Sequence, residues 1–377
     1  MIVLHVDHTS TLGGAERSIL ELAHSQLIAG DRPILAAGCD GRLLNEARAL
    51  GIQTIPMGWP GSYVDAPAST RRLASMFLGI RAAARSLSAT VRDQSPDVVH
   101  IHTRKSQVVG AWAKLAPPLI VHLRDAVPRG GVLRRLVKRA VERSDHAVAL
   151  SPWLRREYQA VGIMPKSGLI GIVPSGVAQE GLRHLGTPWL DGRSRVRVGF
   201  VGQIAKWKAP HLMIELAESL AGESDASFHI IGDVLFPASE AAYGRWLATR
   251  IATSSAADHI TWHGAVSSPG AAMEMIDLLV HTSTEPEPFG RVIVEAMAGN
   301  RPVIAFPRGG ASDILGSSFA YLADGIRIAD LATALRIAIG DREKAKVKAN
   351  LAALEAERYA PVRVAALMSK EYASVLR

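Results

Sequence analysis

Two glutamates flank the start of one predicted helix, and their spacing suits a ligand that carries both charge and hydroxyl groups. Glu287 lies between two prolines in a loop, and Glu295 lies inside the helix predicted for 290–298. Free amides at a helix start, with the positive end of the helix dipole, favour an anion such as a diphosphate. Ionised carboxylates accept strong hydrogen bonds from hydroxyl groups of the kind that sugars carry. The stretch therefore predicts a nucleotide-sugar site; the alternative is that Glu295 only pairs with Arg291 and Glu287 is an ordinary loop acid.

Glycines and a lysine at other predicted strand ends could serve the same chemistry. Lys208 lies where a strand leads into a helix, and a lysine there can neutralise phosphate oxygens. An exposed loop lysine is the alternative. Gly13 and Gly14 stand between a strand and a helix, so their loop either approaches a ligand or forms a plain tight turn. The pattern is not G-x-G-x-x-G, which disfavours a dinucleotide-dependent dehydrogenase.

Two histidines, His102 and His122, lie at or near predicted strand ends, and Arg124 and Asp125 stand close to the second. Neutral imidazole can donate to a sugar hydroxyl or to a phosphate, and it changes charge near neutral pH. A hydrogen-bonded structural histidine is the alternative for each position. No spacing of ligand-type residues indicates a metal site.

Alternating strand and helix patterns must position these residues. Such repeats imply α/β architecture with parallel sheets, whose ligands gather at the carboxyl ends of the strands. We predict a domain at 1–178 that a last helix within 361–377 completes, a linker at 179–194 and a second domain at 195–360. Apolar runs predict strands at 1–8, 33–38, 52–57, 97–102, 119–123 and 146–150, and then at 196–204, 228–233, 260–266, 278–281 and 302–306, and the segment 172–177 closes the first half of the chain.

Composition limits the class of protein. A chain of 377 residues with 48% hydrophobic content is long enough for two cores. A single cysteine, Cys39, excludes a disulfide framework and a cysteine-based metal site. The start of the chain has no basic leader segment, and no apolar run reaches membrane-spanning length, so we expect a cytoplasmic protein.

The net charge of +8 predicts anionic partners such as nucleotide phosphates, a phosphorylated acceptor or the inner face of a membrane. Much of the excess lies between Arg129 and Arg143, where an apolar stripe predicts an amphipathic basic helix. Two interpretations are open. The helix packs on its own domain with a solvated basic face, or it makes peripheral contact with the inner membrane face. We expect no nucleic-acid partner.

The stretch Glu287-Pro-Phe-Gly-Arg-Val-Ile-Val-Glu295 resembles the E-x7-E signature of the retaining GT-B glycosyltransferases of family 4, the glycosyl transferases group 1. The segment 296–303 continues the pattern, and the likeness extends over nearly the whole chain. The segment Val201-Gly-Gln-Ile204 with Lys208 is similar to another motif of the family. Gln203 stands where that motif usually has arginine, and Ala209 stands where it usually has glycine.

The resemblance implies roles for individual residues. Glu287 would contact sugar hydroxyls, Glu295 would hold the ribose, and Lys208 would contact the diphosphate. His122 would orient the sugar or the phosphate, so the implied catalytic residues are His122, Lys208 and Glu287. The remaining acceptor or sugar candidates are His102, Arg124 and Asp125. The implied donor-binding residues are Gly13, Gly14, Gln203, Lys208, Val266, Glu287, Pro288, Phe289, Gly290, Arg291 and Glu295.

The family likeness also implies a fold and a reaction. The fold would be two Rossmann-like domains that face each other across a cleft, with the C-terminal helix returning to the first domain. The reaction would be metal-independent transfer of a sugar, with retained configuration, from a UDP- or GDP-sugar to a carbohydrate, lipid-linked or small-molecule hydroxyl. The sugar nucleotide is then a co-substrate, and no cofactor is expected. A nucleotide-sugar 2-epimerase and an inactive sugar-nucleotide-binding subunit are the alternatives.

Overall fold

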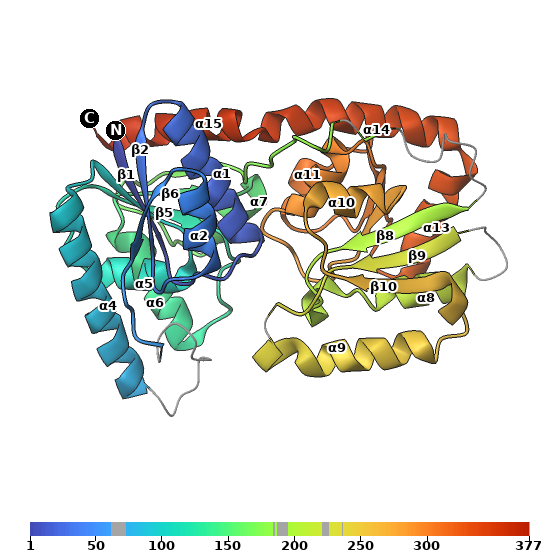
Figure 1. Cartoon of the computed structure of the whole chain (residues 1–377), viewed down its shortest axis with the longest axis horizontal. Coiled ribbons are helices and arrows are strands. Elements are labelled where there is room, and N and C mark those ends of the chain that lie inside the picture. Colours follow the sequence, from blue (N-terminus) through green and yellow to red (C-terminus); the bar gives the residue numbers. More distant parts are fainter. Residues whose placement is uncertain (62–72, 184, 187–194, 221–225, 236, 377) are drawn as a thin grey trace. The chain divides into compact units, whose positions relative to one another are not determined.

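We describe a computed structural model that covers residues 1–376 apart from 62–72, 184, 187–194, 221–225 and 236 (Figure 1). The chain forms two compact units. Unit 1 consists of Met1–Gly176 together with Pro361–Arg377, and unit 2 consists of Val177–Ala360. Residues 184 and 187–194 of the predicted linker lie outside the described residues, and the described part of that linker belongs to unit 2.

Unit 1 is built on a seven-stranded sheet in the order β3-β2-β1-β4-β5-β6-β7, in which all neighbouring strands are parallel. Apart from the edge strand β3, its strands are mostly apolar and buried, as expected for strands that are covered on both faces. They are β1 (Ile2–Asp7), β2 (Arg32–Ala37), β3 (Gln53–Pro56), β4 (Val98–Ile101), β5 (Leu119–Leu123), β6 (His146–Ala149) and β7 (Ile170–Ile172).

Helices cover both faces of this sheet (Figure 1). On one face, the core joins strand residues such as Val3 and Ile120 to α1 and to α15. On the other face, a second core joins residues such as Leu4 and Val99 to α4 and α5. The helices of unit 1 are α1 (Gly14–Ile28), α2 (Arg42–Ala49), α4 (Leu73–Gln94), α5 (Arg104–Trp112), α6 (Gly131–Arg143), α7 (Pro152–Ala160) and α15 (Pro361–Val375).

Unit 2 is built on a six-stranded sheet in the order β10-β9-β8-β11-β12-β13, again with parallel neighbours. The two central strands, β8 and β11, therefore lie side by side although 76 residues separate their ends in the chain. The strands are β8 (Val196–Val201), β9 (Ala226–Ile231), β10 (Ile260–Gly264), β11 (Leu278–His281), β12 (Val303–Ala305) and β13 (Tyr321–Leu322).

The main core of unit 2 lies between this sheet and α8, α9 and α13, and α11 contacts β11 and β12. The α-helices are α8 (Leu212–Ser219), α9 (Pro237–Ala252), α10 (Pro269–Glu274), α11 (Arg291–Ala298), α12 (Gly310–Ile314), α13 (Ile328–Gly340) and α14 (Arg342–Ala356). The 3₁₀ helices are η2 (Lys206–Lys208), η3 (Ala257–His259) and η4 (Glu357–Tyr359). No helix among the described residues is long and apolar enough to span a membrane.

The prediction of two parallel sheets with alternating helices is confirmed, but several boundaries were wrong. The segment 172–177, expected to close the first half of the chain, begins at Ile172, the last residue of β7. The strands predicted for 196–204 and 260–266 end at Val201 and Gly264, so their last residues belong to loops at the carboxyl edge. The prediction missed α2, α10 and β13, which are short.

Candidate functional site

The central feature of unit 2 is a carboxylate held at the carboxyl edge of its sheet. Lys208 is the last residue of η2, which follows β8, and Glu287 lies in the loop after β11. Because β8 and β11 are neighbours, the two residues meet although they are 79 positions apart. Lys208 Nζ forms an ion pair with Glu287 Oε1. The structure therefore brings together two of the residues that we predicted to act on a sugar nucleotide.

The other oxygen of Glu287 is also held. His281, the last residue of β11, places its Nε2 2.6 Å from Glu287 Oε2, and the Ser283 hydroxyl donates to the same oxygen at 3.2 Å. Glu287 is only 9% exposed. Burial on its own would raise the pKa of this carboxyl, but the Lys208 charge and the His281 hydrogen bond outweigh it and hold the pKa well below its ordinary value. Glu287 is therefore a carboxylate, with both oxygens fixed in direction.

The backbone around Glu287 is fixed by a glycine pair from the loop after β12. Gly310 N donates to Glu287 O at 2.6 Å, and Glu287 and Gly309 form a parallel β-bridge. A Cβ atom at Gly309 would lie 2.5 Å from Glu287 O and 2.6 Å from Glu287 N, and its φ of +62° is one that side chains rarely adopt. The glycine pair thus permits two loops to pack together, which positions Glu287.

A helix, α11, starts just after Glu287, where the sequence predicts one. Gly290 has a φ of +107° and caps α11, whose first amides have no acceptor within the helix. Phe289 is buried and lies edge-on to Tyr359, with ring centroids 5.5 Å apart. Inside the helix, Arg291 Nε lies 3.3 Å from Glu295 Oε1, so the simple pair that we considered does form. Glu295 is nevertheless 8% exposed, which is far more buried than is usual for a surface ion pair.

The two other donor-binding candidates of unit 2 lie at the same edge of the sheet. Gln203 follows β8 and is half-buried, and the adjacent Ile204 amide donates to Asp233 O after β9. Val266 follows β10 and is also half-buried. Gln203 follows the same strand as Lys208. Val266 follows β10, which β9 separates from β8.

In unit 1, four histidines from three neighbouring strands form a buried cluster. His5 on β1, His100 on β4 and His122 on β5 point to the same face of the sheet, and His102 follows β4. The rings lie between 4.1 and 5.8 Å from one another, and none is more than 1% exposed. Burial lowers the pKa of every one of these imidazoles, to about 4 for His5. They are therefore neutral at physiological pH.

One cation sets the direction of the hydrogen bonds through this cluster. Arg124 can only donate, and its Nη2 lies 3.3 Å from His102 Nδ1. His102 must then carry its proton on Nε2, which donates to His5 Nδ1 at 2.9 Å. His5 in turn donates from Nε2 to Gln26 Oε1 at 2.7 Å. The tautomers of both histidines therefore follow from the position of one guanidinium.

The chain of hydrogen bonds continues to the last helix of unit 1. Gln26 Nε2 donates to the Tyr372 hydroxyl at 3.2 Å, and that hydroxyl then donates to His100 Nδ1 at 2.7 Å. His100 Nε2 has no hydrogen-bond partner among the described residues, so it ends the chain. Arg124 Nη2 also lies 3.5 Å from His122 Nδ1, while His122 donates from Nε2 to Val173 O at 3.1 Å. His122 is thus buried and already engaged through both ring nitrogens.

A metal ion is the other chemistry that such a cluster allows. His5, His100 and His102 each offer a ring nitrogen, and these atoms lie within 4.8 Å of one another. A metal would need a lone pair on His102 Nε2, which would put a proton on Nδ1 facing the Arg124 donor. The guanidinium therefore favours the hydrogen-bonded form over the metal-bound form. Spacing along the chain did not reveal this group, because His5 belongs to β1 whereas His100 and His102 belong to the segment of β4.

The remaining candidates of unit 1 lie at the same edge of the sheet. Asp125 is half-exposed, and its Oδ2 lies 3.7 Å from Arg104 Nε. Gly13 caps α1, and the Glu16 carboxylate of the first turn accepts from Gly13 N at 2.9 Å. Burial and the negative charge of Asp7 together raise the pKa of Glu16 to about 7. Gly13 and Gly14 therefore belong to a loop whose geometry a buried acid controls.

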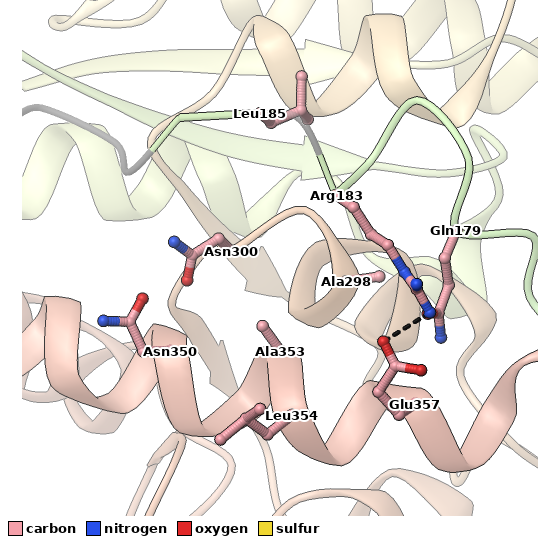
Figure 2. A pocket seen from close by; sticks show the side chains of 9 residues that line it. All are labelled: Gln179, Arg183, Leu185, Ala298, Asn300, Asn350, Ala353, Leu354 and Glu357. Carbon is pink, nitrogen blue, oxygen red and sulfur yellow. Dashed lines mark hydrogen bonds and ion pairs between the residues drawn. The ribbon is translucent and has the colours of Figure 1, made fainter.

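A separate cavity of about 390 Å³ lies in unit 2 (Figure 2). Ala298 and Asn300, at the C-terminal end of α11, line one wall, whereas Glu287 and Gly290 precede its N-terminal end. Arg183 also lines the cavity and pairs with Glu357. The cavity therefore contains none of the predicted donor-binding residues.

Sequence reasoning missed several residues that the structure places at these sites. His281 and Ser283 follow an apolar run that we interpreted only as a buried strand. The interaction between Asp7 and Glu16 was also missed, because nothing in their spacing along the chain indicates that the two acids lie close together. Their common signal is position: His281 and Asp7 end strands, Ser283 follows one closely, and Glu16 lies in the first turn of the helix after β1.

Comparisons with known proteins agree with the two-unit architecture. The family model for Glycosyltransferase Family 4 matches residues 12–180, and that for Glycosyl transferases group 1 matches residues 193–352. No curated protein matches the chain significantly in sequence.

Solved structures of similar proteins share the fold over the whole chain. Anabaena Alr3699/HepE in complex with UDP and glucose is 23% identical, with a TM-score of 0.82 and 99% of both chains covered. A glycosyltransferase from Rickettsia africae is 18% identical, with a TM-score of 0.79, 100% of this chain and 98% of that chain covered. Sucrose-phosphate synthase from Thermosynechococcus elongatus is 16% identical, with a TM-score of 0.80, 99% of this chain and 98% of that chain covered.

At these identities the structural likeness establishes the fold, and the two family models, which between them match most of both units, establish the family. The sheets of seven and six parallel strands with flanking helices are those of the GT-B fold. The chain therefore belongs to the family 4 glycosyltransferases, the glycosyl transferases group 1, and has the GT-B fold.

Proposed function

We propose that this protein transfers a sugar from a UDP- or GDP-sugar to a hydroxyl acceptor, with retention of the anomeric configuration. The observation that carries the proposal is the buried Lys208–Glu287 pair beside the start of α11. Family membership supports nucleotide-sugar glycosyl transfer. The similar HepE was solved with UDP and glucose, and TarM, another similar protein, was solved with UDP, which supports a UDP-sugar as the first donor to test.

Glu287 is suited to hold the sugar. Its ionised oxygens already accept from Lys208, His281 and Ser283, so the one remaining lone pair, on Oε1, has a fixed direction and can accept from a sugar hydroxyl. A group that is oriented before the reaction costs no reorganisation in the transition state. Retaining hydrolases use a carboxylate as a covalent nucleophile. Glu287 is poorly suited to that role, because its oxygens are tied to neighbouring donors.

Lys208 and the first amides of α11 are suited to the leaving group. As the bond between the anomeric carbon and the phosphate oxygen breaks, negative charge develops on the diphosphate. In the proposed front-face reaction, the acceptor oxygen forms its bond on the same face, and its proton passes to the leaving phosphate. With Gln203 in place of the usual arginine, Lys208 supplies more of the positive charge, with help from exposed Lys206.

The acceptor site is proposed to lie at the carboxyl edge of the unit 1 sheet, near Arg124 and Asp125. There, burial keeps His102 and His122 neutral, and the Nδ1 atoms of both rings hold Arg124 Nη2. We propose that His122 acts through this network, since its side chain is 1% exposed. The acceptor class is a carbohydrate, lipid-linked or small-molecule hydroxyl. We also propose a cytoplasmic location. We further propose metal-independent catalysis, because Lys208 and helix amides supply the positive charge that a metal otherwise supplies.

The experiment compares Glu287→Gln and Lys208→Met with the wild type in a donor panel, scored by nucleoside diphosphate release with acceptor present. Each change keeps the side-chain shape but removes a charge. We expect kcat to fall by about 10²–10³-fold, the size of effect seen when one oriented transition-state group is lost. Because removing one member of a buried pair also destabilises the fold, thermal melting is measured in parallel.

Three outcomes of this experiment separate the alternatives. Near-normal turnover by either variant, with an unchanged melting temperature, would show that the substituted residue is not part of the catalytic site. Interconversion of donor sugars without acceptor would identify a 2-epimerase. Binding of a nucleoside diphosphate, seen as a raised melting temperature, without transfer to any acceptor would identify an inactive binding subunit.

A further inference from the structure

All of the excess positive charge of the chain lies in one part of unit 1. Residues 76–143 contain 13 Lys and Arg but only four Asp and Glu, a net charge of +9. The whole chain has a net charge of +8, so the remaining residues together carry −1. The described helices in this stretch are most of α4, all of α5 and all of α6, and they pack in that order on one face of the sheet (Figure 1).

Large apolar side chains are exposed on the same helices. On α4, Phe77 is 42% and Leu78 is 69% exposed, and on α6, Val132 is 43% and Leu133 is 37% exposed. Phe77, Val132 and Arg135 line one wide groove of about 460 Å³. The sequence indicated one basic helix, which is α6. In the structure, α4 lines the same groove, and the groove is apolar as well as basic.

Arginines border these apolar side chains on both helices. Val132, Arg135 and Arg139 recur at helical spacing along the groove wall formed by α6. On α4, exposed Arg81 and Arg85 follow Phe77 and Leu78 along the same helix face. Arg139 also stacks over the Trp112 ring at 4.9 Å, so its position is fixed by an aromatic neighbour.

We propose that this basic–apolar patch, formed by Phe77, Leu78, Val132, Leu133, Arg135 and Arg139, docks on the surface of an anionic lipid bilayer. A bilayer offers phosphate charge and hydrocarbon at neighbouring depths, which matches arginines that border exposed aliphatic side chains. A nucleic acid or another polyanion would use the arginines but would gain nothing from Leu78, Val132 or Leu133. The apolar component is thus what selects a membrane over other anionic partners.

The docking measurement uses the full chain without donor, so its outcome is independent of the proposed transfer reaction. Cosedimentation is measured with vesicles of phosphatidylcholine and phosphatidylglycerol at 70:30, and with phosphatidylcholine alone, at low and at high salt. We expect binding to the anionic vesicles only, and weakening at high salt because salt screens the charge attraction. Equal binding to both kinds of vesicle, or binding to neither, would overturn the proposal.

Two variants and one control locate the surface. Arg135→Glu with Arg139→Glu should weaken binding by more than about tenfold, since each basic residue near an anionic surface contributes roughly fivefold. Val132→Ser with Leu133→Ser should weaken it several-fold at unchanged charge. Lys344→Glu with Lys346→Glu on α14 makes the same charge change in unit 2 and should have little effect.

Each variant is checked for folding by its thermal melting. If the double arginine variant is unstable through loss of the Trp112 contact, Arg135→Glu alone replaces it. Full binding by the arginine variant, or an equal loss in the α14 control, would contradict this location. Unchanged binding by the serine variant would show a general polyanion surface in place of a membrane-docking one, and would also overturn the proposal.

Discussion

Glu16 illustrates how a single buried acid can set the pH response of the protein. It lies in the first turn of α1, is 9% exposed and accepts a hydrogen bond from Gly13. The Asp7 carboxyl is fully buried nearby and contributes to the raised pKa of Glu16. The loop of Gly13 and Gly14 therefore rests on a group whose charge changes near neutral pH.

This position predicts a pH-dependent effect of Glu16→Gln. The folded pKa of about 7 lies above the ordinary value of 4.5, so the native state retains a proton that the unfolded chain releases between those pH values. The contribution of Glu16 to wild-type stability therefore falls as pH rises from 4.5 to 7, and the glutamine variant lacks this one contribution. We expect the variant to be more stable than wild type by about 3 kcal/mol at pH 8 and nearly equal to it near pH 4.5. Urea unfolding at the two pH values measures this difference.

The control for this measurement is Glu46→Gln, at an exposed position on α2. It should change stability little at either pH. A stabilisation by Glu16→Gln that is the same at both pH values would show that titration of Glu16 is not its cause.

At the residue scale, the sequence was informative where a residue type and a local motif coincide. Glu287 and Lys208 could be predicted because one follows a proline-flanked loop and the other joins a strand to a helix. The partners that fix Glu287 could not. His281 and Ser283 contact it only because β11 ends where it does, and Gly309 and Gly310 reach it from another loop. Such contacts depend on sheet order, which spacing along the chain does not reveal.

At the element scale, the histidine cluster ties β1, β4 and β5 to α1 and α15. Strand alternation puts His5, His100 and His122 on the face that these two helices cover, where an apolar core also lies. The hydrogen bonds of the cluster run in one direction from Arg124 to Tyr372, so removing an inner member leaves polar atoms on both sides without partners.

Tyr372→Phe tests this chain of hydrogen bonds. Loss of the hydroxyl removes the partner of Gln26 Nε2 and that of His100 Nδ1, both in a buried region. We expect the free energy of unfolding to fall by about 2–3 kcal/mol, the cost of leaving buried polar groups unsatisfied. Tyr158→Phe is the matched control, because its buried hydroxyl makes a single bond, to Asp125 O. Chemical unfolding that gives equal losses for the two variants would contradict a continuous chain.

Most helices and strands could be predicted from the sequence, and there is a physical reason for those that were missed. Long apolar runs and 3.6-residue periodicity identified most strands and helices. The short elements β13, with two residues, and α10, with six, carry too little periodicity to be recognised.

At the scale of the whole molecule, the chain leaves unit 1 at Gly176, builds unit 2 and returns at Pro361. The returning helix α15 supplies Val364, Ala365, Met368 and Tyr372 to a core of unit 1. The break at Pro361 and the apolar spacing after it made this helix predictable from sequence. The docking of Tyr372 on the histidine cluster was not, because it joins residues 272 positions apart.

Removing residues 361–377 should therefore affect the two units differently. The truncated chain loses four buried side chains of unit 1 but none of unit 2. We expect hydrogen exchange to lose protection in β1 and β4 while β8 and β11 keep theirs. Mass spectrometry of peptides from these strands makes the comparison, and equal loss in both sheets would show that the units do not respond separately.

The return of the chain at Pro361 also has a consequence for synthesis on the ribosome. All residues of unit 2 emerge before the last helix of unit 1 does, so the later-made half can finish folding first. Until it emerges, α15 does not cover its part of the apolar face of β1 and β4 in unit 1. During this interval the nascent chain is most prone to aggregation and most in need of a chaperone.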